Sequence, residues 1–213
     1  VDGNEYTATA SQNGAFICIV DEVCFKYEEI KEYTTVIKVE NTSKALLYLA
    51  KYYKSKLDIK VVAITGSTGK TSTKDLTASV LSSKYKVFKT EGNFNNEIGL
   101  PLMIFKLDKT YDIAVLEMGM SNFGEIHKMA EVALPDVAII TNIGISHIEN
   151  LKTRENILKA KLEITDFFGE NNVLIVNGEE YLLANLEEKE YKLIKTGLEK
   201  NHNIYGYDIK LNE

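Results

Sequence analysis

Cysteine and proline are scarce in this sequence, which contains only two of each. Cys18 and Cys24 lack the C-x-x-C spacing and the neighbouring histidines of a zinc site, and a single pair of cysteines does not make a disulfide scaffold. Both classes are excluded, and a reducing compartment is expected. Pro101 and Pro135 are too few for linker-like segments, so short connections between elements are predicted.

Positive charge and long apolar runs are also lacking. The 31 acidic residues outnumber the 25 lysines and arginines, which gives a formal net charge of -6. Such a chain has no broad basic surface, so nucleic acid is not expected as a partner. No apolar run approaches the roughly 20 residues that cross a bilayer, and the N-terminal residues do not read as a signal peptide. We therefore expect a cytoplasmic protein with no membrane insertion, and a monomer.

From Lys60 onward, short apolar runs alternate with amphipathic stretches. The apolar runs predict strands over residues 61–65, 112–117, 136–141 and 172–177. The stretches between them predict helices around residues 72–83, 122–133, 153–168 and 179–188. Near-continuous apolar strands separated by helices indicate an α/β fold with a mostly parallel, doubly wound sheet.

The first part of the chain has a different pattern and no phosphate-type loop. Strands are predicted over residues 16–20 and 35–39, followed by a helix over 42–54. The boundary is expected at residues 55–58, which gives a smaller α/β domain over 1–56 and a larger domain over 57–213. The end of the chain, residues 192–213, predicts further β structure.

The stretch from Ala63 to Asp75 reads AITGSTGKTSTKD and begins in the first of these apolar runs. Glycines let a backbone wrap closely around an anion, and a helix N-terminus offers its unpaired N–H groups. Lys70 is expected to reach the terminal phosphates of a nucleotide. Thr71 is expected to place its hydroxyl on a magnesium ion.

This loop is shorter than the general phosphate-loop pattern. Ile64 stands where GxxxxGK[ST] has its first glycine, which leaves GxxGKT. A glycine-rich turn without function is the alternative, and the combination of strand, loop and helix argues against it. The residues expected at the nucleotide are Gly66, Ser67, Thr68, Gly69, Lys70, Thr71 and Ser72.

Glu117 follows the apolar run 113–116, at the expected end of a strand. A magnesium ion on Thr71 needs further oxygen ligands, and a carboxylate at the end of a neighbouring parallel strand can supply one. A solvated acid at a strand end is the alternative. The four apolar residues before Glu117 resemble a Walker B strand and favour the metal role.

The next strand, 137–140, is followed by TNIGISH, which brings Asn142 and His147 to the same edge of the sheet. The Asn142 amide is expected at the nucleotide. His147 is a candidate metal ligand or phosphate contact, with a structural histidine as the alternative. His127 and His202 are expected on the surface.

Lys161 occupies an unusual position in the predicted helix 153–168. At 100° per residue it falls near the middle of the apolar face, whereas Lys159 and Glu163 point the other way. In one interpretation its stem packs and its ammonium reaches solvent. In the other, apolar surroundings lower the pKa of Lys161, so that its neutral amine is reactive.

Together these motifs resemble the Mur ligases, the ATP-dependent amide-forming enzymes of peptidoglycan precursor synthesis. The motifs are TGSTGKTSTKD (65–75), TEGNFNNEIGLP (90–101), LEMGMSNFGEI (116–126), ITNIGISHIENL (140–151) and AKLEI (160–164). They occur in the family's order. The family's own phosphate loop is GxxGK[ST], so Ile64 agrees with the resemblance.

The resemblance implies a role for each matching residue. Lys70 would contact the ATP phosphates, and Thr71 with Glu117 would hold a first magnesium ion. Asn95 and Asn96 match the segment that contacts substrate or metal-bound phosphate.

For Lys161 the resemblance implies a covalent change. It matches a lysine that carbon dioxide converts to a carbamate, which with His147 would hold a second magnesium ion. A carbamate removes the positive charge that makes Lys161 anomalous on an apolar face.

Among Mur ligases, the motifs are most similar to those of members that join D-Ala-D-Ala to UDP-N-acetylmuramoyl-tripeptide. Residues 1–56 would then be part of the domain that binds the UDP substrate, and 57–213 part of the central ATP-binding domain. A fragment that does not ligate alone is expected. The alternatives are another amide ligase, of the folylpolyglutamate or cyanophycin type, and a P-loop nucleotide-binding module without catalysis.

Overall fold

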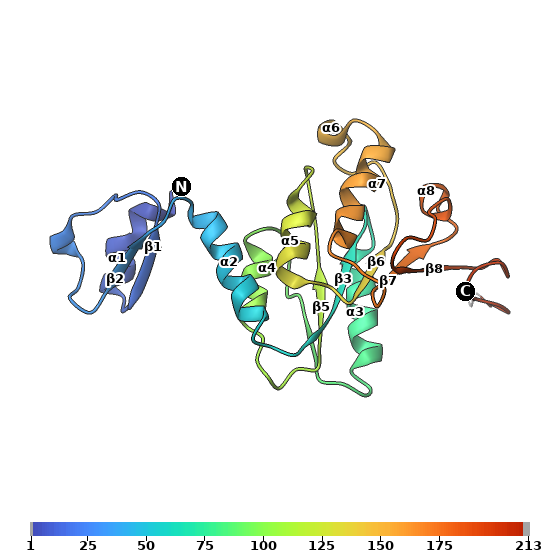
Figure 1. Ribbon diagram of the computed structural model, residues 1–213, viewed down its shortest axis with the longest axis horizontal. Coiled ribbons are helices and arrows are strands. Elements are labelled where there is room, and N and C mark those ends of the chain that lie inside the picture. Colours follow the sequence, from blue (N-terminus) through green and yellow to red (C-terminus); the bar gives the residue numbers. More distant parts are fainter. Residues whose placement is uncertain (1, 211–213) are drawn as a thin grey trace. The chain divides into compact units, whose positions relative to one another are not determined.

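Seven parallel strands form the main sheet of the protein, whose computed structural model describes residues 2–210 (Figure 1). Their order across the sheet is β4-β5-β3-β6-β7-β8-β9. The strands are β3 Lys60–Thr65, β4 Val87–Lys89, β5 Ile113–Glu117, β6 Val137–Ile140, β7 Val173–Asn177, β8 Lys192–Gly197 and β9 Ile204–Tyr205. Every pairing between neighbours is parallel, which confirms the predicted α/β class.

The apolar strands explain why this sheet is covered on both faces. Every residue of β3 after Lys60 is buried, as is every residue of β5 after Ile113. Successive side chains of a strand point to opposite faces, so continuous burial requires cover on both. Helix α3 (Lys70–Leu81) packs against β3, β4 and β5, and its Ala78 joins Val62 and Ile64 in one apolar cluster.

The helices of this sheet unit follow the strands along the chain. After α3 they are α4 Gly99–Ile104, α5 Glu125–Ala133, α6 Ile148–Leu151, α7 Arg154–Leu162 and α8 Tyr181–Ala184. The helices predicted at 72–83 and 122–133 are confirmed with shifted bounds, while β4 and α4 have no counterpart among the predicted elements. Within residues 2–210, no helix has both the length and the apolar character needed to cross a bilayer.

Two predicted helices are shorter in the structure. The helix expected over 153–168 is α7, which continues only as the 3-10 turn Glu163–Thr165. The helix expected over 179–188 is reduced to α8. The Asn185 side chain donates to the Tyr181 carbonyl at 2.8 Å, and this local hydrogen bond marks the end of α8.

The described chain divides between Leu49 and Ala50 into two units. The first contains the 3-10 turns Gly3–Tyr6 and Tyr27–Glu29, helix α1 Thr7–Gln12, strands β1 Ile17–Val20 and β2 Thr35–Lys38, and the start of α2 Thr42–Lys54. Strands β1 and β2 pair in parallel, as a two-stranded sheet. The domain boundary expected at 55–58 follows directly after α2.

Asp21 connects three segments of this first unit. Its Oδ1 accepts a hydrogen bond from Asn4 Nδ2 at 2.7 Å, and its Oδ2 accepts from the N–H and the hydroxyl of Thr42, both at 2.9 Å. The Thr42 N–H, followed by the two side-chain donors, lowers the pKa of Asp21 to about 2. Asp21 thereby holds the start of α2 close to the end of β1.

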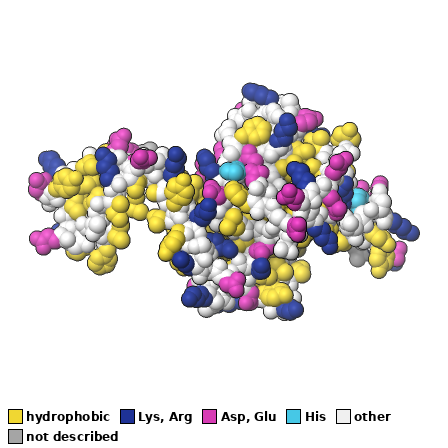
Figure 2. All heavy atoms as spheres, viewed as in Figure 1, with side chains coloured by type: hydrophobic (Ala, Val, Ile, Leu, Met, Phe, Trp, Pro, Cys, Tyr) yellow, Lys and Arg dark blue, Asp and Glu magenta, His cyan; other side chains and the backbone are white. Residues whose placement is uncertain are grey.

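Large apolar side chains remain exposed on the first unit (Figure 2). Burial alternates along β1, where Cys18 and Val20 are buried and Ile17 and Ile19 are exposed. One face of the two-stranded sheet is therefore uncovered within this unit. The exposed residues include Phe16, Ile17, Tyr27, Tyr33 and Ile37.

Candidate functional site

The strand order places the site at the carboxyl edge of the sheet. Strand β3 has β5 and β4 on one side and β6 to β9 on the other. In open parallel sheets, ligands bind at the carboxyl ends of strands where the order reverses. Ile64 pairs with Glu117 of β5, and Thr65 pairs with Ile140 of β6. The loops that carry the predicted site residues therefore begin at one edge.

The loop between β3 and α3 has the form that GxxGKT predicts. Gly66 has φ 152° and Gly69 has φ 77°, conformations that residues with side chains rarely adopt. Lys70 Nζ bends back and donates to the Gly66 carbonyl at 3.0 Å. The N–H groups of the first turn of α3 have no partners within the helix. The loop thus presents N–H donors and a positive charge, which suit an anion.

Glu117 lies beside this loop and is only 3% exposed. Its Oε2 accepts a hydrogen bond from Thr71 Oγ1 at 2.9 Å, and its Oε1 accepts from Asn95 Nδ2 at 2.8 Å. Its N–H donates to Thr90 Oγ1 at 2.9 Å. The carboxylate is therefore held in place next to the threonine hydroxyl, and both are hard oxygen donors of the kind that magnesium prefers.

A cavity of about 260 Å³ adjoins the phosphate loop. Six of the predicted site residues line it, namely Gly66, Lys70, Asn95, Asn96, His147 and Lys161. Four residues that were not predicted also line it: Gly119, Met120, Ser121 and Glu125. The fold thus gathers residues from the loops after β3, β4, β5 and β6, together with helix α7, around one space.

Lys161 is the most deeply buried charged side chain of this cavity, with 2% of its surface exposed. Burial lowers the pKa of Lys161 from its ordinary value to about 7, and the positive charge of Lys70 adds to the effect. Among residues 2–210, no carboxylate forms an ion pair with its ammonium group. This burial favours the interpretation in which a neutral, reactive amine faces the cavity.

His147 enters the same cavity from the residue just before α6. Its φ of 63° is in the left-handed region, which is uncommon for a residue with a side chain and often marks functional sites. Of the other histidines, His127 lies at the surface as predicted, with 46% of its side chain exposed. The prediction for His202 is wrong: its side chain is 8% exposed because Gly178 and Gly197 leave room for the ring.

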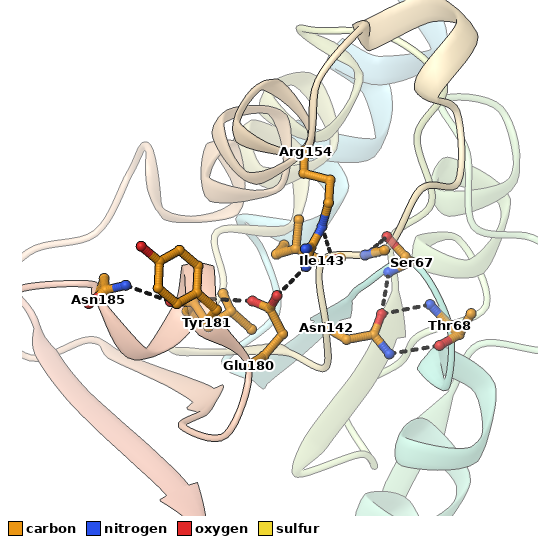
Figure 3. A network of polar contacts seen from close by, with 10 residues as sticks. Ser67, Thr68, Asn142, Ile143, Arg154, Glu180, Tyr181 and Asn185 are labelled. Carbon is orange, nitrogen blue, oxygen red and sulfur yellow. Dashed lines mark hydrogen bonds and ion pairs between the residues drawn. The ribbon is translucent and has the colours of Figure 1, made fainter.

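Asn142 contacts the phosphate loop itself (Figure 3). Its Oδ1 accepts from the N–H groups of Ser67 at 3.1 Å and Thr68 at 3.0 Å, and its Nδ2 donates to Thr68 Oγ1 at 2.7 Å. The Gly144 N–H donates to Ser67 Oγ at 2.8 Å. These side chains stabilise the loop and, like Ser72, do not line the cavity. Their contact with a nucleotide stays a prediction.

Two acidic residues of the site were not identified from sequence. Glu125 lines the cavity, and its carboxylate accepts from the Ser121 N–H at 2.7 Å. Glu163 accepts from the N–H groups of Gly124 at 2.8 Å and His127 at 3.1 Å, so it caps the start of α5. Glu125 stands within the motif 116–126. Glu163 stands within the motif 160–164, but its capping role depends on a contact with the distant helix α5 that the motif does not reveal.

The parallel sheet, the GxxGKT loop at its switch point and the acidic end of β5 define a P-loop protein of the α/β class. The profile of the Mur ligase middle domain matches residues 64–213, and the chain belongs to the Mur ligase family.

Individual relatives resemble the chain over nearly its whole length. The UDP-N-acetylmuramoyl-tripeptide–D-alanyl-D-alanine ligase of Bacillus subtilis is 44% identical over 204 residues, which cover 96% of this chain and 43% of the relative. MurF from Acinetobacter baumannii superposes with a TM-score of 0.88 at 31% identity, covering 99% of this chain and 46% of that one. MurF from Thermotoga maritima in complex with ADP superposes with a TM-score of 0.83 at 34% identity. The match covers 93% of this chain and 45% of that one. The chain thus spans less than half the length of these relatives.

Proposed function

We propose that this chain forms the ATP-binding part of a ligase that joins D-Ala-D-Ala to UDP-N-acetylmuramoyl-tripeptide. The observation that carries the proposal is the cavity in which Lys70, His147 and Lys161 meet, beside the hydrogen-bonded pair Thr71 and Glu117. The names of the Bacillus subtilis relative and of the two MurF structures support the same reaction.

ATP is proposed to bind with its phosphates on the loop 66–71, an assignment that the ADP in the Thermotoga maritima structure supports. Lys70 would exchange the Gly66 carbonyl for a phosphate oxygen. Thr71 and Glu117, whose oxygens lie 2.9 Å apart, would hold the first magnesium ion. When bound, magnesium offsets the negative charge that gathers around the phosphates. Asn142 is proposed to lie at the nucleotide while it supports the loop from behind.

Lys161 is proposed to carry a carbamate. An amine with a pKa of about 7 is about half unprotonated in neutral solution, whereas a lysine with its ordinary pKa is almost fully protonated there. Its nitrogen would attack the carbon of CO2, and the proton released would pass to solvent, leaving an anion in place of a buried cation. With His147 in the same cavity, this anion would supply the ligands of a second magnesium ion.

The proposed reaction proceeds by activation of a carboxylate. The terminal carboxylate of the tripeptide takes the γ-phosphoryl group of ATP, which gives an acyl phosphate and ADP. The amine of D-Ala-D-Ala attacks the acyl carbon, and the resulting tetrahedral intermediate collapses to an amide and free phosphate. Lys70 would offset charge on the transferred group, and Asn95 and Asn96 would position the substrate. A serine or cysteine nucleophile is not required.

Residues 1–56 are proposed to contribute to binding of the UDP substrate. The first unit contains a cavity of about 660 Å³, a size that suits a nucleotide-sized ligand. It is lined by Asp21, Lys38, Val39, Glu40, Asn41, Lys44, Ala45 and Tyr48.

The ligase proposal can be tested in a chimera in which this chain replaces the matching segment of the Bacillus subtilis relative. We expect ATP-dependent ADP release that requires both UDP-N-acetylmuramoyl-tripeptide and D-Ala-D-Ala. Lys70→Met should lower the rate by about 100-fold or more. ADP release that responds instead to a folate and glutamate would favour the folylpolyglutamate type. A folded chimera that releases no ADP with any acceptor would contradict the proposal.

The metal assignment predicts a specific effect of Thr71→Val. The substitution removes the hydroxyl that bonds Glu117 while preserving the β-branched shape, so we expect magnesium to strengthen ADP binding about tenfold less than in the wild type. Titration calorimetry with ADP, with and without magnesium, measures the effect. Thr77→Val in the same helix is the matched control and should behave as the wild type. An unchanged magnesium effect in Thr71→Val would remove Thr71 from the metal site.

A further inference from the structure

Arginine is used once in this sequence. Lysines and arginines together number 25, and Arg154 is the only arginine. Its guanidinium group is therefore the only one in the sequence. Arg154 is the first residue of α7, seven residues before Lys161, and it does not line the site cavity.

The Arg154 side chain joins two segments that are distant in sequence (Figure 3). Its Nε and Nη2 both donate to the Ile143 carbonyl, at 3.0 and 2.6 Å. Nη2 also pairs with the Glu180 carboxylate. The second oxygen of Glu180 accepts from the Leu183 N–H at 3.0 Å, which caps α8. Arg154 is therefore oriented by an acid that is itself fixed to a helix.

The contact with Ile143 sets the orientation of one peptide group. The carbonyl of Ile143 and the N–H of Gly144 belong to the same planar peptide and point in opposite directions. With the carbonyl directed to Arg154, the N–H is directed to the phosphate loop, where it donates to Ser67 Oγ. A rotation of this peptide would break the two Arg154 hydrogen bonds and the Gly144 hydrogen bond at once. Arg154 thus stabilises a contact with the loop that it does not touch.

The limited space around Gly144 restricts the orientations that the peptide 143–144 can adopt. A Cβ at Gly144 would lie 3.2 Å from the Ser67 Cβ, so the two backbones already approach closely. Asn142, two residues before Gly144, uses its side chain to hold the N–H groups of Ser67 and Thr68. Rotation of the peptide 143–144 would therefore disturb several contacts of the phosphate loop together.

We propose that Arg154, oriented by Glu180, is a positioning residue for the phosphate loop and that nucleotide affinity depends on it. The proposal rests on the proposed function in that ADP is the ligand whose affinity responds. Arg154 acts by holding the Ile143 carbonyl, so that Asn142 and Gly144 keep the loop in the form that wraps an anion. A lysine carries one ammonium group and cannot reproduce the planar fork that serves the carbonyl and the carboxylate together.

The test combines two measurements on the chain as it stands. In Arg154→Met we expect the amides of Gly144 and Ser67 to exchange with solvent at least tenfold faster, and ADP to bind about tenfold more weakly, which corresponds to about 1.4 kcal/mol. Arg154→Lys should restore only part of the affinity. The matched control is Lys51→Met, which removes the ion pair of Lys51 with Glu131 at 2.7 Å, away from the site, and should change neither quantity.

Equal effects of Arg154→Met and Lys51→Met would overturn the proposal, because they would show a general loss of stability. So would weaker ADP binding with unchanged exchange at Gly144 and Ser67. If the wild type does not bind ADP, the proposed function fails, while the exchange rates still decide whether Arg154 holds the loop. Should Arg154→Met not fold, Glu180→Gln provides the second variant: it keeps the size of the side chain, and we expect about threefold effects in the same direction.

Discussion

Replacing Gly66 with alanine is expected to abolish nucleotide binding and to destabilise the protein. A Cβ at this position would lie 1.8 Å from Thr141 Oγ1 and 3.1 Å from Thr141 Cβ. The hydroxyl cannot move away freely, since it donates to the Thr68 carbonyl at 2.6 Å. Overpacking of about 1–3 kcal/mol adds to backbone strain of similar size. We therefore expect the free energy of unfolding to fall by about 2–5 kcal/mol, measured by urea denaturation.

Gly69 provides a matched control for this prediction. Its φ of 77° is also unfavourable for alanine, but no atom lies within 4 Å of the added Cβ. Gly69→Ala should therefore cost only the backbone strain, about 1–2 kcal/mol. Adding Thr141→Ala to Gly66→Ala removes the closest contact and should recover part of the stability. Equal losses in the two glycine variants would show that close packing against Thr141 is not the cause.

Replacing Lys161 with methionine is expected to raise stability in neutral solution and to remove a pH dependence. In buffer free of CO2, the unfolded chain binds a proton at Lys161 below pH 10.5, whereas the folded protein binds it only below about pH 7. Between these values the unfolded state holds more protons, so the stability of the wild type rises with pH by up to about 1.4 kcal/mol per unit. Lys161→Met lacks this slope. The gain in stability of Lys161→Met over the wild type is largest below pH 7 and shrinks as the pH approaches 10.5.

Urea denaturation between pH 7 and pH 10 measures this difference, and bicarbonate adds a second test. A carbamate replaces the buried cation, so bicarbonate should stabilise the wild type and leave Lys161→Met unchanged. In the chimeric ligase, Lys161→Met should lower activity by about 100-fold or more. Lys159→Met, on the exposed side of the same helix, should leave stability and its pH dependence unchanged. Parallel pH profiles of the wild type and Lys161→Met would contradict the burial argument.

Much of the fold and site is readable from local patterns. Strand β3 is a continuous apolar run followed by glycines and a lysine, a combination that predicts both the buried strand and the anion site. Glu117 follows from the rule that parallel strands end at one edge. Lys161 is conspicuous because a charged residue interrupts an apolar helical face. Each of these signals lies within about ten residues of sequence.

The contacts that support the site are not local, and for that reason they were missed. Arg154 and Glu180 lie 26 residues apart in sequence and are brought into contact by the pairing of β7 with β6. The residues next to each of them form no motif that predicts this contact. Glu163 caps α5 across a similar distance. The early end of α8 coincides with a side-chain hydrogen bond from Asn185 to the Tyr181 carbonyl, which competes with an otherwise helical pattern.

The order of strands in the sheet has a consequence for how the protein is made. Lys60 at the start of β3 pairs with Ile113, and Thr65 at its end pairs with Ile140, so the central strand leaves the ribosome well before either partner. Until then the segment KVVAIT is an unpaired apolar strand, the type of segment that promotes aggregation during synthesis. Nascent chains in which residue 140 has not yet left the ribosome should therefore require chaperones, whereas chains in which β6 has emerged can close the sheet around β3.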